Sequence, residues 1–367
     1  MRKIFLLFLV QFGAFSFLTA QKTFTEPYKI LTGHGDDMDA LAVSPEKGYL
    51  ATGSWDKLVN IYNLDSPYQL IRTLTGHQAP VTDLFFNKTG SMLASGSNDF
   101  MVKLWDSLFQ VRNFEGHHGN VNTLLFDNSG KYLFSGSDDK TIIAWDIASG
   151  KPFKTINNFT EVNSIAFGND PRFLFAAGNE PKIKVYNLAT LQVARTFDGH
   201  TAAVNCIDIS KNNLYLISGS NDKSARIWDI KTGKEIRKLP VDCWKVIAVI
   251  FSDDSRYAAT GCNDGSIKVW EVATGNLISQ TPASGNSVHE IAFLKDNKFI
   301  AVTNVVRNEA SHGLRIWKTG IDPNANTEIV NPKTNTEKPK MPAVKPANMR
   351  TDSLKKSNSV QKTIPKK

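Results

Sequence analysis

Short apolar stretches separated by Gly, Asn, Asp and Ser recur along most of the chain. In one such unit the apolar stretch VNTLLF (121–126) is followed by NSG, and KYLFSGS then leads to an Asp-Asp pair. TIIAWDI alternates apolar and polar residues, and ASG separates it from KPFKTI. Stretches of this length, bounded by turn-forming residues, are typical of β-strands joined by tight turns. Each unit is therefore predicted to form a four-stranded β-meander, with no room for a helix of about ten residues.

This unit recurs seven times. The aromatic residue near the end of its third strand is Tyr62, Trp105, Trp145, Tyr186, Trp228, Trp270 and Trp317, at spacings of 43, 40, 41, 42, 42 and 47 residues. In four units a Gly-His pair places a His 28 residues before the aromatic residue: His34, His77, His117 and His200. One such sheet buries too little to be stable alone, but several packed face to face around an axis bury their shared faces. We therefore expect one all-β domain over residues 21–318, a seven-bladed β-propeller of four-stranded antiparallel blades.

Three copies of the unit resemble the repeat of the WD-repeat β-propeller family. They are ASGSNDFMVKLWD, FSGSDDKTIIAWD and ISGSNDKSARIWD, which end at Asp106, Asp146 and Asp229. Weaker copies end at Asn63, Asn187, Glu271 and Lys318, so the resemblance covers roughly residues 27–318. It implies that the sequence repeat is offset from the blade. Tyr28–Leu31 would then supply the outer strand of the last blade, and the ring would close by pairing this N-terminal strand with the strands of 288–317.

Each full copy also contains the residue types of a hydrolase triad, Ser, His and Asp. Three sets are complete and the first is nearly so: His77, Ser95, Asp99, Trp105; His117, Ser135, Asp139, Trp145; His200, Ser218, Asp222, Trp228; and His34, Thr52, Asp56, Tyr62. An enzyme needs one pre-positioned nucleophile, so the repetition favours a structural role. The family resemblance implies a hydrogen-bonded chain from the indole through the hydroxyl and the His to the Asp. Repeat four departs from this set, and repeat six has Asp242 in place of the His.

The family resemblance also implies a partner-binding face, the top face, at the ends of the propeller's inner strands. Two positions per repeat point there, one five residues after the His and one before the turn Asp. With Trp244, they give these candidates: Asp39, Thr82, Asn122, Asn163, Asn205 and His289; then Trp55, Asn98, Asp138, Asn179, Asn221 and Asn263. Turn chemistry accounts for the second set at least as well as ligand contact, whereas Asn within a strand favours ligand contact for the first. Trp residues dominate binding hot spots, which favours Trp55 and Trp244.

The charge of the chain lies at its ends. Of the net +8, residues 1–20 contribute Arg2 and Lys3, residues 319–367 contain ten Lys/Arg against four Asp/Glu, and residues 21–318 are neutral. A neutral body argues against nucleic acid as a partner. The basic segment 319–367 is rich in Lys, Pro and Asn, which predicts a disordered tail that either contacts an anionic surface weakly or only improves solubility.

The first 20 residues have the pattern of a secretory signal. Arg2 and Lys3 precede an apolar run of about fifteen residues, and Ala20 precedes the expected cleavage point. The run is shorter than the roughly 20 residues that span a bilayer, so an uncleaved anchor is the less favoured alternative. We therefore expect an exported protein, periplasmic or extracellular.

The chemistry-bearing residues give no further site. Cys206, Cys243 and Cys262 lack CxxC spacing, so simple burial is favoured, with one disulfide as the alternative. Repeat seven carries a longer loop at 304–312, which indicates either a functional loop or drift in a closing blade. No cofactor or metal is expected. The resulting hypothesis is a non-catalytic, monomeric protein-interaction scaffold that binds a protein or peptide partner on the top face. The alternative is a ligand-binding or enzymatic propeller that uses Asp39 and His289 in the central funnel.

Overall fold

The computed structural model describes residues 21–321 except 66, 107–108, 159, 295–296 and 305–312. The predicted signal (1–20) and all of the predicted tail from residue 322 onward therefore lie outside the described residues, as does most of the long loop of repeat seven. Within the described residues every regular element longer than one residue is a β-strand.

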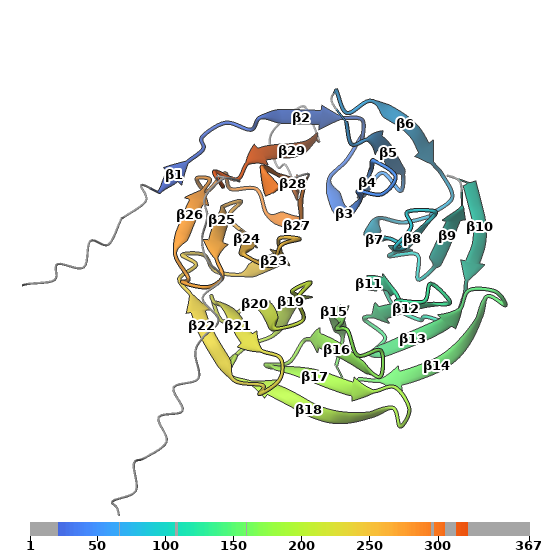
Figure 1. The fold of residues 1–367 in the computed structure, drawn as a ribbon. Coiled ribbons are helices and arrows are strands. Elements are labelled where there is room, and N and C mark those ends of the chain that lie inside the picture. Colours follow the sequence, from blue (N-terminus) through green and yellow to red (C-terminus); the bar gives the residue numbers. More distant parts are fainter. Residues whose placement is uncertain are drawn as a thin grey trace, which may run out of the picture. The chain divides into compact units, whose positions relative to one another are not determined.

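These strands form seven sheets arranged in a ring (Figure 1). Blades 1 to 3 consist of β3 (Met38–Ser44), β4 (Tyr49–Ser54), β5 (Val59–Asn63) and β6 (Leu70–Leu74); β7 (Val81–Phe86), β8 (Met92–Ser97), β9 (Val102–Asp106) and β10 (Phe109–Phe114); and β11 (Val121–Phe126), β12 (Tyr132–Ser137), β13 (Thr141–Asp146) and β14 (Lys151–Asn157). Blades 4 and 5 consist of β15 (Val162–Phe167), β16 (Phe173–Gly178), β17 (Lys182–Asn187) and β18 (Gln192–Asp198); and β19 (Val204–Ile209), β20 (Tyr215–Ser220), β21 (Ala225–Asp229) and β22 (Glu235–Leu239). Blades 6 and 7 consist of β23 (Val246–Phe251), β24 (Tyr257–Cys262), β25 (Ile267–Glu271) and β26 (Leu277–Gln280); and β27 (Val288–Phe293), β28 (Phe299–Asn304), β29 (Gly313–Lys318) and β2 (Lys29–Thr32).

The ring closes as predicted. β2 pairs antiparallel with β29, from Lys29 opposite Ile316 to Thr32 opposite Gly313. The inner strand of each blade contacts the inner strand of the next, and β27 of blade 7 contacts β3 of blade 1. The prediction of a seven-bladed propeller of antiparallel four-stranded blades, closed by an N-terminal strand, is therefore confirmed.

The repeated Gly of the second strand allows neighbouring blades to approach closely. A Cβ added to Gly136 would lie 2.5 Å from Cγ1 of Val162, the first residue of the next inner strand. The same clash would arise at Gly261, 2.4 Å from Val288. Since real Cβ atoms do not come this close, only Gly lets these valines pack into the interface between blades.

An additional strand was not predicted. β1 (Lys22–Thr23) pairs parallel with the outer strand β26 of blade 6, which makes that blade five-stranded. Residues just after β29 lie at the same place, since Ser279 Oγ donates to the Thr319 carbonyl at 2.5 Å and Lys22 Nζ donates to the Gly320 carbonyl at 3.0 Å. Both ends of the propeller therefore continue from blade 7 onto blade 6.

Candidate functional site

The triad-like residues of blade 3 form one buried hydrogen-bonded chain. Trp145 Nε1 donates to Ser135 Oγ at 2.7 Å, and Ser135 Oγ lies 2.7 Å from His117 Nε2. His117 Nδ1 lies 2.7 Å from a carboxylate oxygen of Asp139. Because a carboxylate only accepts, Nδ1 carries the proton and the Ser135 hydroxyl donates to Nε2. Ser135 is 0% exposed, so its hydroxyl is closed to a substrate.

Blades 2 and 5 repeat this hydrogen-bonded chain. Blade 1 has the part of it that joins the hydroxyl, the His and the Asp. The indole donates to the hydroxyl at 2.8 Å in both blades, from Trp105 to Ser95 and from Trp228 to Ser218. In blade 1, His34 lies 2.8 Å from Thr52 Oγ1 and 2.9 Å from Asp56. Burial lowers the pKa of His117 and His200 despite the facing carboxylates, which keeps both rings neutral.

Two blades use other contacts at these positions. In blade 4 the Tyr186 hydroxyl donates directly to Asn158 Oδ1 at 2.6 Å, and Ala176 fills the place of the Ser. In blade 6 Trp270 Nε1 still donates to Thr260 Oγ1 at 3.0 Å, but Asp242 pairs with Lys268 at 2.7 Å. In blade 4 the Tyr186 hydroxyl therefore takes the place of both the indole and the Ser hydroxyl. Blade 6 keeps only the bond between the indole and the hydroxyl.

The first set of top-face candidates connects neighbouring blades. Asn122, Asn163 and Asn205 donate from Nδ2 to the backbone carbonyl that begins the next inner strand, at 3.0, 3.1 and 2.8 Å. Thr82 Oγ1 donates to the corresponding Val121 carbonyl. Asn122 Nδ2 also donates to Asp138 at 2.6 Å, and Asn205 Nδ2 donates to Asn221 at 2.9 Å. An amide NH₂ has two protons, so the donors of Asn122 and Asn205 are both engaged within the protein.

This contact predicts a loss of stability for Asn205→Ala. The change removes a bond between blades 5 and 6 and a bond to Asn221, so we expect the free energy of unfolding to fall by about 1–2 kcal/mol in urea denaturation. Asn98→Ala is the matched control, because within the described residues the Asn98 side chain has no hydrogen bond and only its backbone N–H donates, to Pro80 at 3.0 Å. Equal stability of both variants would contradict the inter-blade role.

Asp39 joins blades 1 and 7 at the same level. One carboxylate oxygen accepts from Trp55 Nε1 at 2.7 Å, and the other lies 2.9 Å from His289 Nδ1. The two titratable candidates of the central funnel are thus paired with each other. Catalysis would further need a nucleophile and an oxyanion site in reach, and the pair alone supplies neither.

Three of the thirteen top-face candidates are exposed, and the others are half-buried: Trp55, Asn179 and Trp244 are the exposed ones. Trp244 is 70% exposed, against 44% for Trp55, and lies in the loop between β22 and β23. Lys223 lies in the tight turn of blade 5, and its Nζ is 3.8 Å from the centre of the Trp244 ring. These two residues line a shallow pocket of about 250 Å³ with Val241, Asp242 and Cys243. Lys223 was not predicted, although its place after the turn residue Asp222 marks it as a top-face residue.

Three carboxylic residues of the inner strands were also missed. Burial raises the pKa of Asp83 to about 7 and that of Asp208 to about 6, although backbone N–H groups of Leu124 and Phe251 in the next blades donate to them. Burial, together with the charges of Asp83 and Asp208, raises the pKa of Glu290 well above its ordinary value. An acidic residue within an otherwise apolar inner strand, as in VTDLFF, was the available signal.

The part of the chain that the structure describes contains neither a candidate metal cluster nor a candidate membrane-spanning helix. No group of three His, Cys, Asp or Glu residues there could hold a metal ion. No helix there is long and apolar enough to cross a membrane. Cys243 and Cys262 form a disulfide, the alternative to simple burial, and Cys206 is a free thiol.

Curated proteins with similar sequences match short parts of the chain. COMPASS component SWD3 of Saccharomyces cerevisiae is 39% identical over 79 residues, 22% of this chain and 24% of that protein. THO complex subunit 3 of Arabidopsis thaliana is 33% identical over 79 residues, 22% of this chain and 25% of that protein. Probable cytosolic iron-sulfur protein assembly protein 1 of Yarrowia lipolytica is 41% identical over 80 residues, 21% of this chain and 24% of that protein. The chain thus spans a quarter or less of the length of these relatives.

These relatives correct the expected localisation. One is named as cytosolic, two are named as parts of protein complexes, and none of the three is named as an exported protein. The expectation of an exported, periplasmic or extracellular protein is contradicted by them and is withdrawn. It depended on Arg2 and Lys3, the apolar run and Ala20, all within residues 1–20, which lie outside the described residues.

The repeats themselves determine the family. The sequence model described as WD domain, G-beta repeat matches residues 25–63, 68–106, 109–146, 191–229 and 233–271. The matched segments together cover more than half of the chain, and each ends at the third strand of a blade. Repeats four and seven have no match: in repeat four Tyr186 bonds directly to Asn158, and in repeat seven Trp317 Nε1 has no hydrogen-bond partner within the described residues. The chain therefore belongs to the WD-repeat family.

Proposed function

We propose that this protein is a non-catalytic interaction scaffold that binds a protein partner on its top face, at the pocket beside Trp244. The observation that carries the proposal is the 70% exposure of Trp244 beside a pocket of the top face. Large exposed aromatic residues beside a pocket are typical of binding hot spots, because their burial by a partner contributes much of the binding energy.

The positions of the other candidates support this choice within the top face. Asn122, Asn163 and Asn205 donate their amide N–H groups to neighbouring blades, so they hold the surface rigid and contribute little to a partner. Lys223 forms no ion pair within the described residues and lies directly over the Trp244 ring. A partner segment with an apolar side chain and a carboxylate would find both contacts here.

The relatives support a partner that is a protein. Two carry names of complex components, the COMPASS component and the THO complex subunit. We therefore place this chain in a multiprotein complex of the nucleus or cytosol, with the propeller as a rigid docking platform. The absence of a substrate path to Ser135 supports a non-catalytic role, because that hydroxyl is fully buried.

The test is affinity capture with the full chain and two matched variants. Trp244→Ala is expected to reduce recovery of the bound protein at least about tenfold, since a hot-spot Trp contributes about 2 kcal/mol or more. Phe153→Ala is the control, because Phe153 is an aromatic residue of comparable exposure, 52%, on the outer strand β14. Undiminished capture by Trp244→Ala, with both variants folded, would refute the proposed site.

A further inference from the structure

In the blades with a complete His-Asp pair, hydrogen bonds tie each inter-blade loop to the tight turn beneath it. An inter-blade loop is the segment between the outer strand of one blade and the inner strand of the next. The residue after the His donates its N–H to the turn Asp at 2.8–3.1 Å, in the pairs Gly35–Asp56, Gln78–Asp99, His118–Asp139 and Thr201–Asp222. A Ser at the end of the second strand adds a bond to a loop carbonyl in three of these blades, from Ser54, Ser97 and Ser220.

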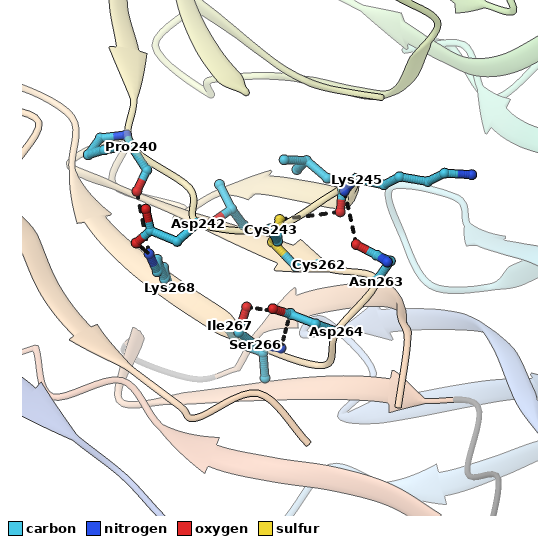
Figure 2. Close-up of a disulfide and its surroundings, with 12 residues drawn as sticks. Pro240, Asp242, Cys243, Lys245, Cys262, Asn263, Asp264, Ser266, Ile267 and Lys268 are labelled. Atoms are coloured by element: carbon cyan, nitrogen blue, oxygen red, sulfur yellow. Dashed lines mark hydrogen bonds and ion pairs between the residues drawn. A yellow bond between two sulfur atoms is a disulfide. The ribbon is translucent and has the colours of Figure 1, made fainter. Parts of the chain in front are cut away.

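In blade 6 both of these positions are cysteines. Cys243 follows Asp242 as Thr201 follows His200, and Cys262 ends β24 as Ser220 ends β20. The two form a disulfide (Figure 2). The turn residue Asp264 accepts from Ser266, at 2.9 Å from the backbone and 2.6 Å from the side chain, but within the described residues it accepts no bond from the Cys243 N–H. A covalent bond therefore stands where the other blades use hydrogen bonds.

The remaining contacts of this loop hold mainly its C-terminal end. Lys245 N donates to Asn263 Oδ1 at 2.9 Å, and Asn263 N donates to the Lys245 carbonyl at 3.1 Å. Earlier in the loop, the buried Lys268 ammonium pairs with Asp242 and donates to the Pro240 carbonyl at 3.4 Å, but the Asp242 side chain is 87% exposed, which weakens this ion pair. The disulfide is thus the strongest restraint on the segment that carries Trp244.

We propose that Cys243 and Cys262 form a reversible thiol–disulfide site that controls docking at Trp244. This inference rests on the proposed function. In the reducing compartments to which we assign the protein, disulfides are generally transient and serve in sensing. Oxidation fixes the loop and pre-organises Trp244 over its pocket, whereas reduction frees the loop and adds an ordering cost to binding.

The exchange needs a dithiol reductant. One thiolate of the reductant attacks a sulfur of the pair, which forms a mixed disulfide and releases the other cysteine as a thiolate. The second thiol of the reductant then displaces the first cysteine. The reductant ends as a disulfide, and Cys243 and Cys262 gain two electrons and two protons. Cys206 does not compete, because burial raises the pKa of its thiol and suppresses the reactive thiolate.

The first measurement is hydrogen exchange in the full chain, oxidised and after dithiothreitol. The amides of Lys245 and Asn263 are expected to exchange at least about tenfold faster after reduction, because their mutual bonds lose the covalent support next to them. The Asn221 amide in blade 5, bound to the Ala203 carbonyl at 3.0 Å, is the internal control and should not change. Equal exchange in both states would overturn the proposal.

Two variants separate the pair from other effects of the reductant. Cys206→Ser should keep the full response, since it leaves the disulfide intact. Cys262→Ser should abolish the response, because it removes the bond and places at this position the hydroxyl that blades 1, 2 and 5 use. A response that survives Cys262→Ser would overturn the assignment.

Capture of the partner then distinguishes this inference from the proposed function. Lower capture after reduction, together with loss of capture in Trp244→Ala, supports both. Loss in Trp244→Ala with unchanged capture after reduction overturns the redox control and leaves the docking site standing. Retained capture in Trp244→Ala overturns the docking site and, with it, the control of docking.

Discussion

Replacing Ser135 by Ala is expected to lower the free energy of unfolding by about 3 kcal/mol, because two buried groups lose their partner at once. Trp145 Nε1 loses its acceptor and His117 Nε2 loses its donor, each at 2.7 Å in the intact protein. Both side chains are buried, so water cannot replace the hydroxyl without opening the blade. Equilibrium denaturation in urea, followed by tryptophan fluorescence, measures the change.

Ser149→Ala is the control for this substitution. Ser149 lies exposed in the turn between β13 and β14 of the same blade, and its loss should change stability by less than about 0.5 kcal/mol. An equally small effect at Ser135 would mean that the hydrogen-bonded chain does not brace the blade. Blade 4 shows how the hydroxyl can be dispensed with, since Tyr186 reaches Asn158 directly beside Ala176.

Much of the fold could be predicted because it repeats. Trp105, Trp145 and Trp228 occupy the same register position in blades 2, 3 and 5, and the spacing of the seven equivalent aromatic residues predicted the number and order of blades. The closing strand followed from the offset of repeat and blade that the family resemblance implied. β1 could not be foreseen, since two residues paired with β26 leave no periodic signal and depend only on where the chain passes.

The candidate site was less predictable, because it depends on contacts between residues of neighbouring blades. The sequence alone suggests that the Asn205 amide is available to a partner. In the structure its Nδ2 donates to the Val246 carbonyl of the next blade. The disulfide joins residues 19 apart in sequence, and only the fold of blade 6 brings Cys243 and Cys262 together. Trp244 was a candidate because of its residue type. The position of Lys223 over its ring could not be predicted, because Lys223 lies in the tight turn of another blade.

The inner strands also carry three buried acidic residues that the repeat pattern did not reveal. Asp83 and Glu290 are the third residues of their inner strands and Asp208 is the fifth residue of its own, so no acidic residue recurs from blade to blade as the aromatic residues do. The ring brings the three acidic residues near enough that the charges of Asp83 and Asp208 raise the pKa of Glu290, in addition to its burial. Asp83 and Asp208 at least accept backbone N–H bonds from Leu124 and Phe251. Within the described residues Glu290 has no such partner for its carboxylate.

Glu290→Gln should therefore stabilise the propeller above neutral pH. The folded-state pKa of Glu290 lies above the ordinary value of 4.5, so the folded protein binds more protons than the unfolded chain between these two values. Its stability falls as the pH rises through that window, and the full cost of the charge is present at pH values above it. Removing the charge is expected to raise the melting temperature at a pH of about 8.5 by about 2–4 °C, equivalent to about 1 kcal/mol.

The pH dependence separates charge from packing. The gain in melting temperature should shrink toward zero at a pH of about 4, where Glu290 is protonated in both folded and unfolded states. Glu46→Gln, at an exposed position between β3 and β4, should show no gain at either pH. A constant difference between Glu290→Gln and the unaltered protein at both pH values would show that shape rather than charge causes the effect. The expected convergence would instead identify the crowding of carboxylates on the inner strands as a cost that the bonds between blades must offset.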